Sequence, residues 1–389
     1  MIRKLVIISN YFPDEQYSML RFSDLIEYVM SDYGIIIEII RPIERASKLR
    51  KYFPNFEKWF FYIDKYLFFP FELMALVLKT RVLADTVYHI TDHSNAIYSL
   101  LLHNRPLLVT CHDVLAIRSA KGEMPQNPIG VTGKILQKSI LYGLKKVKRI
   151  VCVSKKTESD LRRLIGNRSS KITTVLNPLN FKYHPIPKEL AINNISILGD
   201  SVANAVRDGF ILHVGGNQWY KNRIGACNIY IEMAHERLRR GIRIPHLILA
   251  GKEPSEEIKK FISENSDLPI HIIASPGTEE LQSLYSLASM LLFPSLEEGF
   301  GWPILEAMAC GCPVVTSGRP PMTEVGGEAA IYIDPLKISE AAHILNEVLV
   351  WSVARRQEQV QKGVENLRRF SREKFTDHYL NAYQEALLS

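Results

Sequence analysis

The stretch SMLLFPSLEEGFGWPILEAMACGCPVVTS, residues 289–317, predicts one complete strand–helix–strand unit. Residues 289–295 form a short apolar run, and the glycine-rich turn EEGFGWP follows it directly. Trp302 and Pro303 mark the start of a helix, because proline suits the first helical turn. A second apolar run, 312–317, ends the unit. A strand, a helix and a second strand in this order are typical of a parallel sheet, so the stretch predicts an α/β fold.

The same alternation extends over the chain. Continuously apolar runs are typical of parallel strands that helices cover on both faces. Helical patterns separate most of these runs, which indicates two similar doubly wound sheets. The runs predicted as strands are 4–10, 35–40, 86–90, 107–113, 149–154 and 172–177 in the first half, and 210–216, 245–251, 270–275, 289–295, 312–317 and 329–334 in the second.

Two domains are expected from the length of 389 residues, which exceeds what one hydrophobic core usually supports. The first is predicted over 1–195 and the second over 208–370. The polar stretch 187–209 lies between the two sets of strands and is interpreted as a linker region. The final helical pattern, 371–389, has no strand after it and is expected to pack back on the first domain.

Charge is divided unevenly along the chain. Residues 1–195 hold 29 basic and 17 acidic side chains, a net +12, whereas the remainder holds 19 and 24, a net −5. A basic half suits an anionic substrate, an anionic membrane surface or nucleic acid, but no nucleic-acid-binding module is recognisable. No segment is apolar enough to span a membrane, and no signal peptide is recognised. Five cysteines inside apolar runs indicate reduced thiols and a cytoplasmic protein.

The turn at 298–306 carries the residues with the clearest chemistry. Glycines at 299 and 301 let a ligand approach the backbone, and the free N–H groups of a helix start favour an anion such as a diphosphate. Glu306, one turn into the helix, can accept two hydrogen bonds from the vicinal hydroxyls of a ribose. Glu298 can do the same for a second sugar. The simpler alternative is that Glu306 only complements the helix dipole.

The stretch 298–317 resembles the signature of the retaining, nucleotide-sugar-dependent glycosyltransferases of family 4, also called group 1. In that family seven residues separate two glutamates, as seven residues separate Glu298 and Glu306. The resemblance extends through ILHVGGNQWYKN, HLILAGK, VSKKTESDL, EVGGEAAIYIDP and FSREKFTDHYL, so it covers most of the chain. It implies the GT-B fold, in which two Rossmann-like domains face each other across a cleft.

The resemblance also implies roles for individual residues. Glu306 would hold the donor ribose and Glu298 the transferred sugar. The backbone amides of Gly299, Phe300 and Gly301 would contact the sugar and the diphosphate. The donor, a nucleotide sugar, is a substrate, and no cofactor is expected.

A second donor-site segment is GGNQWYKNR, at the end of the strand predicted at 210–216. Lys221 matches the family's phosphate-binding lysine, with Asn222 after it and Gly216 before it; a solvated surface lysine is the alternative. Family members often carry an arginine near this lysine. Here Arg223 follows two residues later, so the number of cations at the leaving group is an open question.

Histidines and aspartates at the strand ends of the first half form the remaining candidates. His112 corresponds to a family histidine that faces the transferred sugar, which makes it a catalytic candidate with Glu298 and Lys221. His89, Asp92, His93 and, beside His112, Asp113 are expected on the acceptor side. These residues lack the spacing of metal ligands, and no Asp-x-Asp motif occurs, so a metal-independent enzyme is expected.

The acceptor is expected to be a glycan or a lipid-linked glycan, and a hexose the transferred group. Residues 56–79 are rich in aromatics, which suits either a core helix or a helix on a membrane interface. With the basic first half, the second reading implies a peripheral contact with the inner face of the membrane. A glycosidase would leave Lys221 and the phosphate-type turn unexplained. The alternative function is a non-catalytic sugar- or nucleotide-binding protein, such as an inactive homologue.

Overall fold

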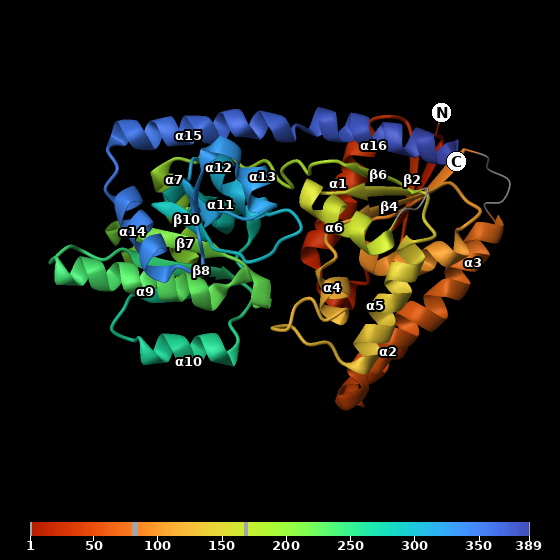
Figure 1. Cartoon of the computed structure of the whole chain (residues 1–389), viewed down its shortest axis with the longest axis horizontal. Helices are drawn as coiled ribbons and strands as arrows, with labels where there is room; N and C mark the ends of the chain where they lie inside the picture. The colour runs from red at the N-terminus through yellow and green to blue at the C-terminus, as the bar shows by residue number, and fades with distance from the viewer. Residues whose placement is uncertain (1, 80–84, 167–169, 389) are drawn as a thin grey trace. The chain divides into compact units, whose positions relative to one another are not determined.

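The computed structural model describes residues 2–79, 85–166 and 170–388 and divides into two compact units (Figure 1). The first unit comprises Met1–Asn180 and Arg372–Ser389, and the second Phe181–Ser371. The sequence placed the boundary near residue 195, whereas the structure places it after Asn180. The reason is that helix α7 (Lys188–Ile195) packs on α11 (Thr278–Leu287), with Asn194 donating a hydrogen bond to Ser283.

The stretch interpreted as a linker, 187–209, is helical in the structure. Helices α7 and α8 (Asp200–Asp208) occupy most of it. Ala191 and Ile195 are buried, so α7 contributes an apolar face to the second unit. The segment is therefore part of a domain.

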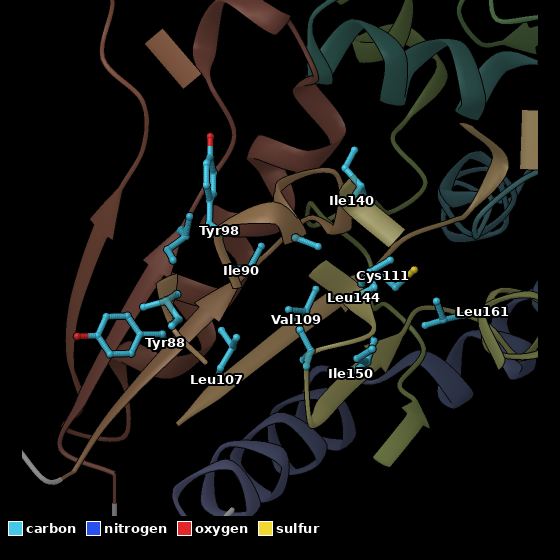
Figure 2. Close-up of a cluster of buried hydrophobic side chains, with 14 of the residues drawn as sticks. Tyr88, Ile90, Tyr98, Leu107, Val109, Cys111, Ile140, Leu144, Ile150 and Leu161 are labelled. Atoms are coloured by element: carbon cyan, nitrogen blue, oxygen red, sulfur yellow. The ribbon is translucent and has the colours of Figure 1, made fainter. Parts of the chain in front are cut away.

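The first unit is built on a six-stranded parallel sheet of order β2-β1-β3-β4-β5-β6. Every residue of β3 and β4 is buried, as continuously apolar runs predict for strands covered on both faces. The side chains on one face form a single core with residues of the covering helices, part of which Figure 2 shows. The strands are β1 (Lys4–Ile8), β2 (Ile36–Ile40), β3 (Thr86–Ile90), β4 (Leu107–Cys111), β5 (Arg149–Cys152) and β6 (Lys171–Thr174).

The helices of the first unit begin and end where local chemistry dictates. For α6 (Lys155–Ile165), the Ser154 side chain accepts a hydrogen bond from the N–H of Thr157, and Gly166 follows with a φ of 73°. The other helices are α1 (Tyr17–Ser31), α2 (Glu57–Ile63), α3 (Phe69–Lys79), α4 (Leu115–Ala120), α5 (Val131–Leu144) and α16 (Arg372–Leu387).

Buried polar contacts fix the last helix, α16, to the first sheet. The His89 ring bonds Thr110 Oγ1 at 2.8 Å through Nε2 and Tyr383 at 2.9 Å through Nδ1. The hydroxyl of Tyr379 lies 2.9 Å from Thr110 Oγ1. His89 was expected on the acceptor side, and that expectation is wrong. It lies within β3, fully buried, and its ring is used to hold α16.

The second unit repeats the plan with a parallel sheet of order β12-β11-β10-β7-β8-β9. The two six-stranded sheets confirm the doubly wound prediction. The strands are β7 (Phe210–Val214), β8 (His246–Gly251), β9 (Ile270–Ala274), β10 (Met290–Phe293), β11 (Val314–Ser317) and β12 (Ala330–Ile333). The remaining helices are α9 (Arg223–Arg239), α10 (Glu256–Glu264), α12 (Trp302–Ala309), α13 (Met322–Gly326), α14 (Ile338–Leu349) and α15 (Val353–Leu367).

Each sheet has one point where the strand order reverses. In the first sheet this point lies between β1 and β3, and in the second between β7 and β10. Loops that leave the carboxyl ends of such strands diverge, and the crevice between them is where open α/β sheets bind ligands. The loops after β1, β3, β7 and β10 therefore flank the two expected ligand-binding positions.

None of the helices in the described residues combines the length and the hydropathy needed to cross a membrane.

The pH dependence of unfolding follows from the neutral state of His89. Burial, and to a lesser degree the nearby His112, lowers the pKa of His89 to about 3, below its ordinary value of 6.5. The unfolded chain therefore binds a proton that the folded chain excludes, and stability falls as the pH drops below the unfolded pKa, by up to about 1.4 kcal/mol per pH unit. We expect His89→Gln to flatten the pH dependence of urea unfolding between about pH 7 and about pH 5.

The control for this experiment is the wild-type chain measured over the same range. His93 has the opposite sign, because its pairing with Asp92 raises its pKa in spite of burial. Its contribution is present in both proteins and cancels in the difference. Equal slopes for the two proteins would show that His89 does not remain neutral in the fold.

Candidate functional site

An ion pair joins the two loops that leave the switch point of the second sheet. Lys221, after β7, places its Nζ 2.7 and 3.0 Å from the carboxylate oxygens of Glu298, after β10. Ser295 Oγ donates a third hydrogen bond to Oε1 of Glu298 at 2.9 Å. Glu298 is 7% exposed and the Lys221 side chain 18% exposed. Two of the three catalytic candidates thus lie in direct contact.

Backbone contacts hold the same two loops together. The side chain of Asn222 donates a hydrogen bond to the carbonyl oxygen of Pro294 at 3.0 Å. The N–H of Leu296 donates one to the carbonyl oxygen of Tyr220 at 2.8 Å. Asn222 has a φ of 54°, in the left-handed region that asparagine tolerates. Asn222 therefore shapes the loop that presents Lys221. Gly216 belongs to the same loop, and a Cβ there would lie 2.4 Å from Oε1 of Gln218.

Helix α12 begins directly after the glycine-rich turn. Gly301 is its N-cap residue and has a φ of 106°, a conformation that favours glycine. The ring of Phe300 is buried against Trp302 and Phe370, so this side chain anchors the turn. The start of α12 also carries the positive end of the helix dipole, which favours an anion.

Glu306 lies further along α12 and is 4% exposed. Tyr285 of α11 donates a hydrogen bond to its Oε2 at 2.9 Å. Burial and the adjacent Glu306 raise the pKa of Tyr285 well above its ordinary value, so the hydroxyl stays a donor. A buried, oriented carboxylate is more than a complement to the helix dipole, and it can accept hydroxyl groups of a ligand.

Arg223, the arginine after Lys221, ties two loops together. Its Nη1 donates to Oδ1 of Asn217 at 2.8 Å and to the carbonyl oxygen of Lys252, after β8, at 3.0 Å. The neighbouring His213 is buried in β7. Burial, opposed by a hydrogen bond to the Leu292 carbonyl, and the charges of Arg223 and Lys221 lower the pKa of His213 to about 4. Both cations therefore act electrostatically on this strand end.

The switch point of the first sheet holds a second close pair of titratable side chains, Asp92 and His93. Asp92, after β3, lies 3.1 Å from Nδ1 of His93 and accepts hydrogen bonds from Asn10 Nδ2 at 2.6 Å and from the N–H of Ser94 at 3.0 Å. Burial opposes ionisation of Asp92, but His93, His112 and Asn10 hold its pKa well below the ordinary value. Asp92 in turn raises the pKa of His93. The two buried side chains form an ion pair when His93 is protonated.

His112 follows β4 and is held close to this pair. Its Nε2 donates to the carbonyl oxygen of Thr91 at 2.8 Å, and the ring packs edge-on against Phe22. Burial lowers the pKa of His112 in spite of the nearby Asp92, so the ring is neutral at pH 7 and Nδ1 is an acceptor. Asp113 accepts a hydrogen bond from the N–H of Leu115 at 2.9 Å, which places one of its oxygens at the start of α4.

The sequence reasoning missed three residues that orient these groups. Asn10 and Ser295 are the last residues of the runs 4–10 and 289–295 that the sequence predicts as strands. Their position at the end of a predicted strand was the only indication of a role. Tyr285 lies in the middle of a helix, and nothing in the sequence linked it to Glu306. Among the residues that the structure describes, no three or more His, Cys, Asp or Glu side chains are grouped as metal ligands.

Comparisons with known proteins cover both units. A model described as "Glycosyltransferase Family 4" matches residues 41–182, and one described as "Glycosyl transferases group 1" matches residues 209–350. The chain is 30% identical over 255 residues to the O-antigen chain mannosyltransferase B of Escherichia coli, a match that covers 64% of each protein. It is 32% identical over 130 residues to an MMP alpha-(1->4)-mannosyltransferase of Mycolicibacterium hassiacum, covering 32% of this chain and 31% of that protein.

These matches span less than two thirds of the length of the curated relatives. Among solved structures, the chain is similar to HepE of Anabaena in complex with UDP and glucose. The TM-score is 0.69 at 14% identity, and the likeness covers 98% of this chain and 100% of the other. At this identity the likeness concerns the fold.

Removal of the Tyr285 hydroxyl tests its contact with Glu306. We expect Tyr285→Phe to lower the free energy of unfolding by about 1.5–3 kcal/mol, because the hydrogen bond has a charged acceptor. Tyr230→Phe is the matched control: its hydroxyl donates at 2.8 Å to a neutral acceptor, the Pro245 carbonyl, in the same unit, and we expect a loss of about 0.5–1.5 kcal/mol. Urea unfolding measures both. Equal losses would mean that Glu306 does not act as a charged acceptor.

Proposed function

The chain belongs to the group 1, family 4 glycosyltransferases, and from this premise we propose that it moves a mannosyl residue from a nucleoside-diphosphate sugar to a glycan hydroxyl. Its two parallel sheets and its likeness to solved structures confirm the predicted GT-B fold. The choice of mannose follows from the relatives, which are named as mannosyltransferases. The observation that carries the proposal is the Lys221–Glu298 pair beside the start of α12, at the switch point of the second sheet.

The pair supplies what a nucleotide-sugar donor needs at its leaving group. Negative charge grows on the diphosphate as the glycosidic bond breaks, and a fixed cation in a partly buried site stabilises that charge. The ammonium group of Lys221 has three donors, so it can keep one contact with Glu298 while it binds a phosphate oxygen. The backbone N–H groups of Gly299, Phe300 and Gly301 and the start of α12 add the dipole contribution.

The two glutamates are proposed to hold different parts of the donor. Glu306, oriented by Tyr285, accepts hydrogen bonds from the hydroxyl groups of the ribose. Glu298, oriented by Ser295 and Lys221, accepts hydrogen bonds from hydroxyl groups of the transferred sugar. Asn222 and Gly216 shape the loop that carries Lys221. Transfer is proposed to proceed with retention of configuration and without a metal ion, as the family resemblance implies.

The first unit is proposed to serve the transferred sugar and the acceptor. His112 presents a neutral Nδ1 as an acceptor for a sugar hydroxyl, because its Nε2 is used by Thr91. The Asp92–His93 pair and the second oxygen of Asp113 are proposed to bind acceptor hydroxyls. The acceptor is inferred to be a glycan, or a glycan linked to a lipid at the inner face of the membrane, since the E. coli relative acts on O-antigen chains by its name.

The experiment that tests the function is a thermal-shift panel followed by a transfer assay. GDP, UDP, ADP, GDP-mannose and UDP-glucose are compared on the full chain. One nucleoside diphosphate and its mannose conjugate should raise the melting temperature by about 5–10 °C at a hundredfold excess over Kd. Mannose release or transfer from the conjugate confirms catalysis. A shift without any turnover on glycan acceptors would favour the non-catalytic homologue instead.

The two glutamates should separate the nucleotide from the sugar. We expect Glu306→Gln to weaken binding of the free nucleoside diphosphate by about 10- to 100-fold, the value of a hydrogen bond to a charged group. Glu298→Gln should leave that affinity within a few fold and lower turnover of the sugar conjugate instead. Calorimetric titration and initial rates measure the two effects. Glu328→Gln, on an exposed glutamate of the same unit, is the control. The opposite pattern would exchange the two assigned roles.

A further inference from the structure

The segment before and at the start of α2 exposes an unusual set of side chains. Every residue from 51 to 59 is exposed, and four of these nine are large aromatics. Tyr52 is 77% exposed, and Phe53, Phe56 and Trp59 are each more than half exposed. Helix α2 has no buried residue in its seven positions. Figure 1 shows the beginning of α2 as the lowest part of the first unit. We call residues 48–59 the aromatic tip.

The exposure is not a consequence of loose attachment. Asp64, buried just after α2, accepts hydrogen bonds from Tyr11 at 2.7 Å, from the N–H of Ala46 at 2.8 Å and from that of Ser47 at 3.1 Å. Phe61 of α2 packs edge-on against Tyr11. The base of the tip is thus fixed to the loop after β1. The fixed base keeps the four aromatic rings in contact with water, which is unfavourable for apolar surface. Binding of a partner would remove this surface from water.

The expectation that 56–79 is a core helix holds for only part of it. Phe69 and Leu73 of α3 are buried in the core, with Leu76 and Val77 packed against it. Helix α2, in the first half of the segment, has no buried residue. The physical reason is that only α3 has a helical apolar face against the sheet, whereas α2 packs on its own neighbours in the chain.

Charge around the tip is basic. Lys48, Lys51 and Lys58 are exposed, whereas the one acidic side chain, Glu57, lies 3.9 Å from Arg50. The side chain of Lys58 lies over the ring of Tyr62, which directs it along α2. Exposed Trp, Tyr and Phe combined with lysine are typical of segments that lie in a membrane interface. Cores of protein–protein interfaces are instead depleted in lysine.

We propose that the aromatic tip docks on an anionic lipid bilayer, with the rings of Tyr52, Phe53, Phe56 and Trp59 in the headgroup region and the three lysines against lipid phosphates. This inference deepens the proposed function, on which it rests for its purpose: it names the surface that brings the chain to a lipid-linked acceptor. Apolar insertion and electrostatic attraction add, and each removed lysine costs about 1 kcal/mol, or about fivefold in binding.

The test is co-sedimentation of the full chain with lipid vesicles. Vesicles of phosphatidylcholine alone are compared with vesicles that also contain phosphatidylglycerol, at low and high salt. We expect binding to the anionic vesicles that weakens with salt. Combined Tyr52→Ser, Phe53→Ser, Phe56→Ser and Trp59→Ser should lower binding by about tenfold or more. Combined Lys48→Gln, Lys51→Gln and Lys58→Gln should lower it by about a hundredfold.

Two controls keep the result specific. Leu336→Ser with Val350→Ser removes exposed apolar side chains, 66% and 70% exposed, from the second unit and should leave vesicle binding unchanged. Unchanged melting temperatures show that the variants fold, because every substituted side chain is exposed. The thermal shift with the nucleoside diphosphate is measured in parallel, so a failure of the proposed function appears there and not in the vesicle assay.

Three outcomes would overturn the docking proposal. One is vesicle binding by the serine variant that equals that of the wild type. Another is the same weak binding to both kinds of vesicle. The third is self-association of the wild type that the serine variant loses, which would assign the tip to a second copy of the chain.

Discussion

The ion pair between Lys221 and Glu298 is the contact on which the second unit's site depends. It joins two loops that are 77 residues apart in the chain, and it does so at 2.7 Å across the point where the strand order reverses. Charges held partly out of water need further hydrogen bonds to offset desolvation. Ser295 supplies one to Glu298, and Asn222 and Leu296 tie the surrounding backbone. A cation and a carboxylate are thereby fixed before any donor arrives, which is the condition for electrostatic preorganisation.

The first unit applies the same rule with different chemistry. Its switch point lies between β1 and β3, and there Asn10 and His93 converge on Asp92. In the second unit the paired charges of Lys221 and Glu298 lie beside the start of α12, whose dipole adds positive character. Under the proposed function, the first unit binds a hydroxyl-rich acceptor and the second a diphosphate.

Stability and binding surfaces are also separated within the first unit. The buried hydrogen bonds of His89 with Thr110 and Tyr383 hold α16 to the sheet. Asp64 uses the same means, several hydrogen bonds to one buried group, to fix the base of the aromatic tip. His89 and Asp64 are buried and hydrogen-bonded, whereas the aromatic side chains of the tip are exposed. This division explains how a segment with four exposed aromatics keeps a defined shape.

The sequence by itself determined the strands, since β-branched runs without alternation are typical of a sheet covered on both faces, and it located Glu298 and Glu306 by their spacing around a glycine turn. It misplaced the domain boundary, because a polar stretch such as 187–209 shows no periodicity until Ala191 and Ile195 find a partner helix. It could not separate α2 from α3, because apolar side chains occur in both and only packing shows that α3 alone contributes buried residues to the core. Only the tertiary structure decided that β7 neighbours β10, and with it that Lys221 meets Glu298 and Tyr285 meets Glu306. Strand order is fixed by packing between distant segments, and no local pattern encodes it.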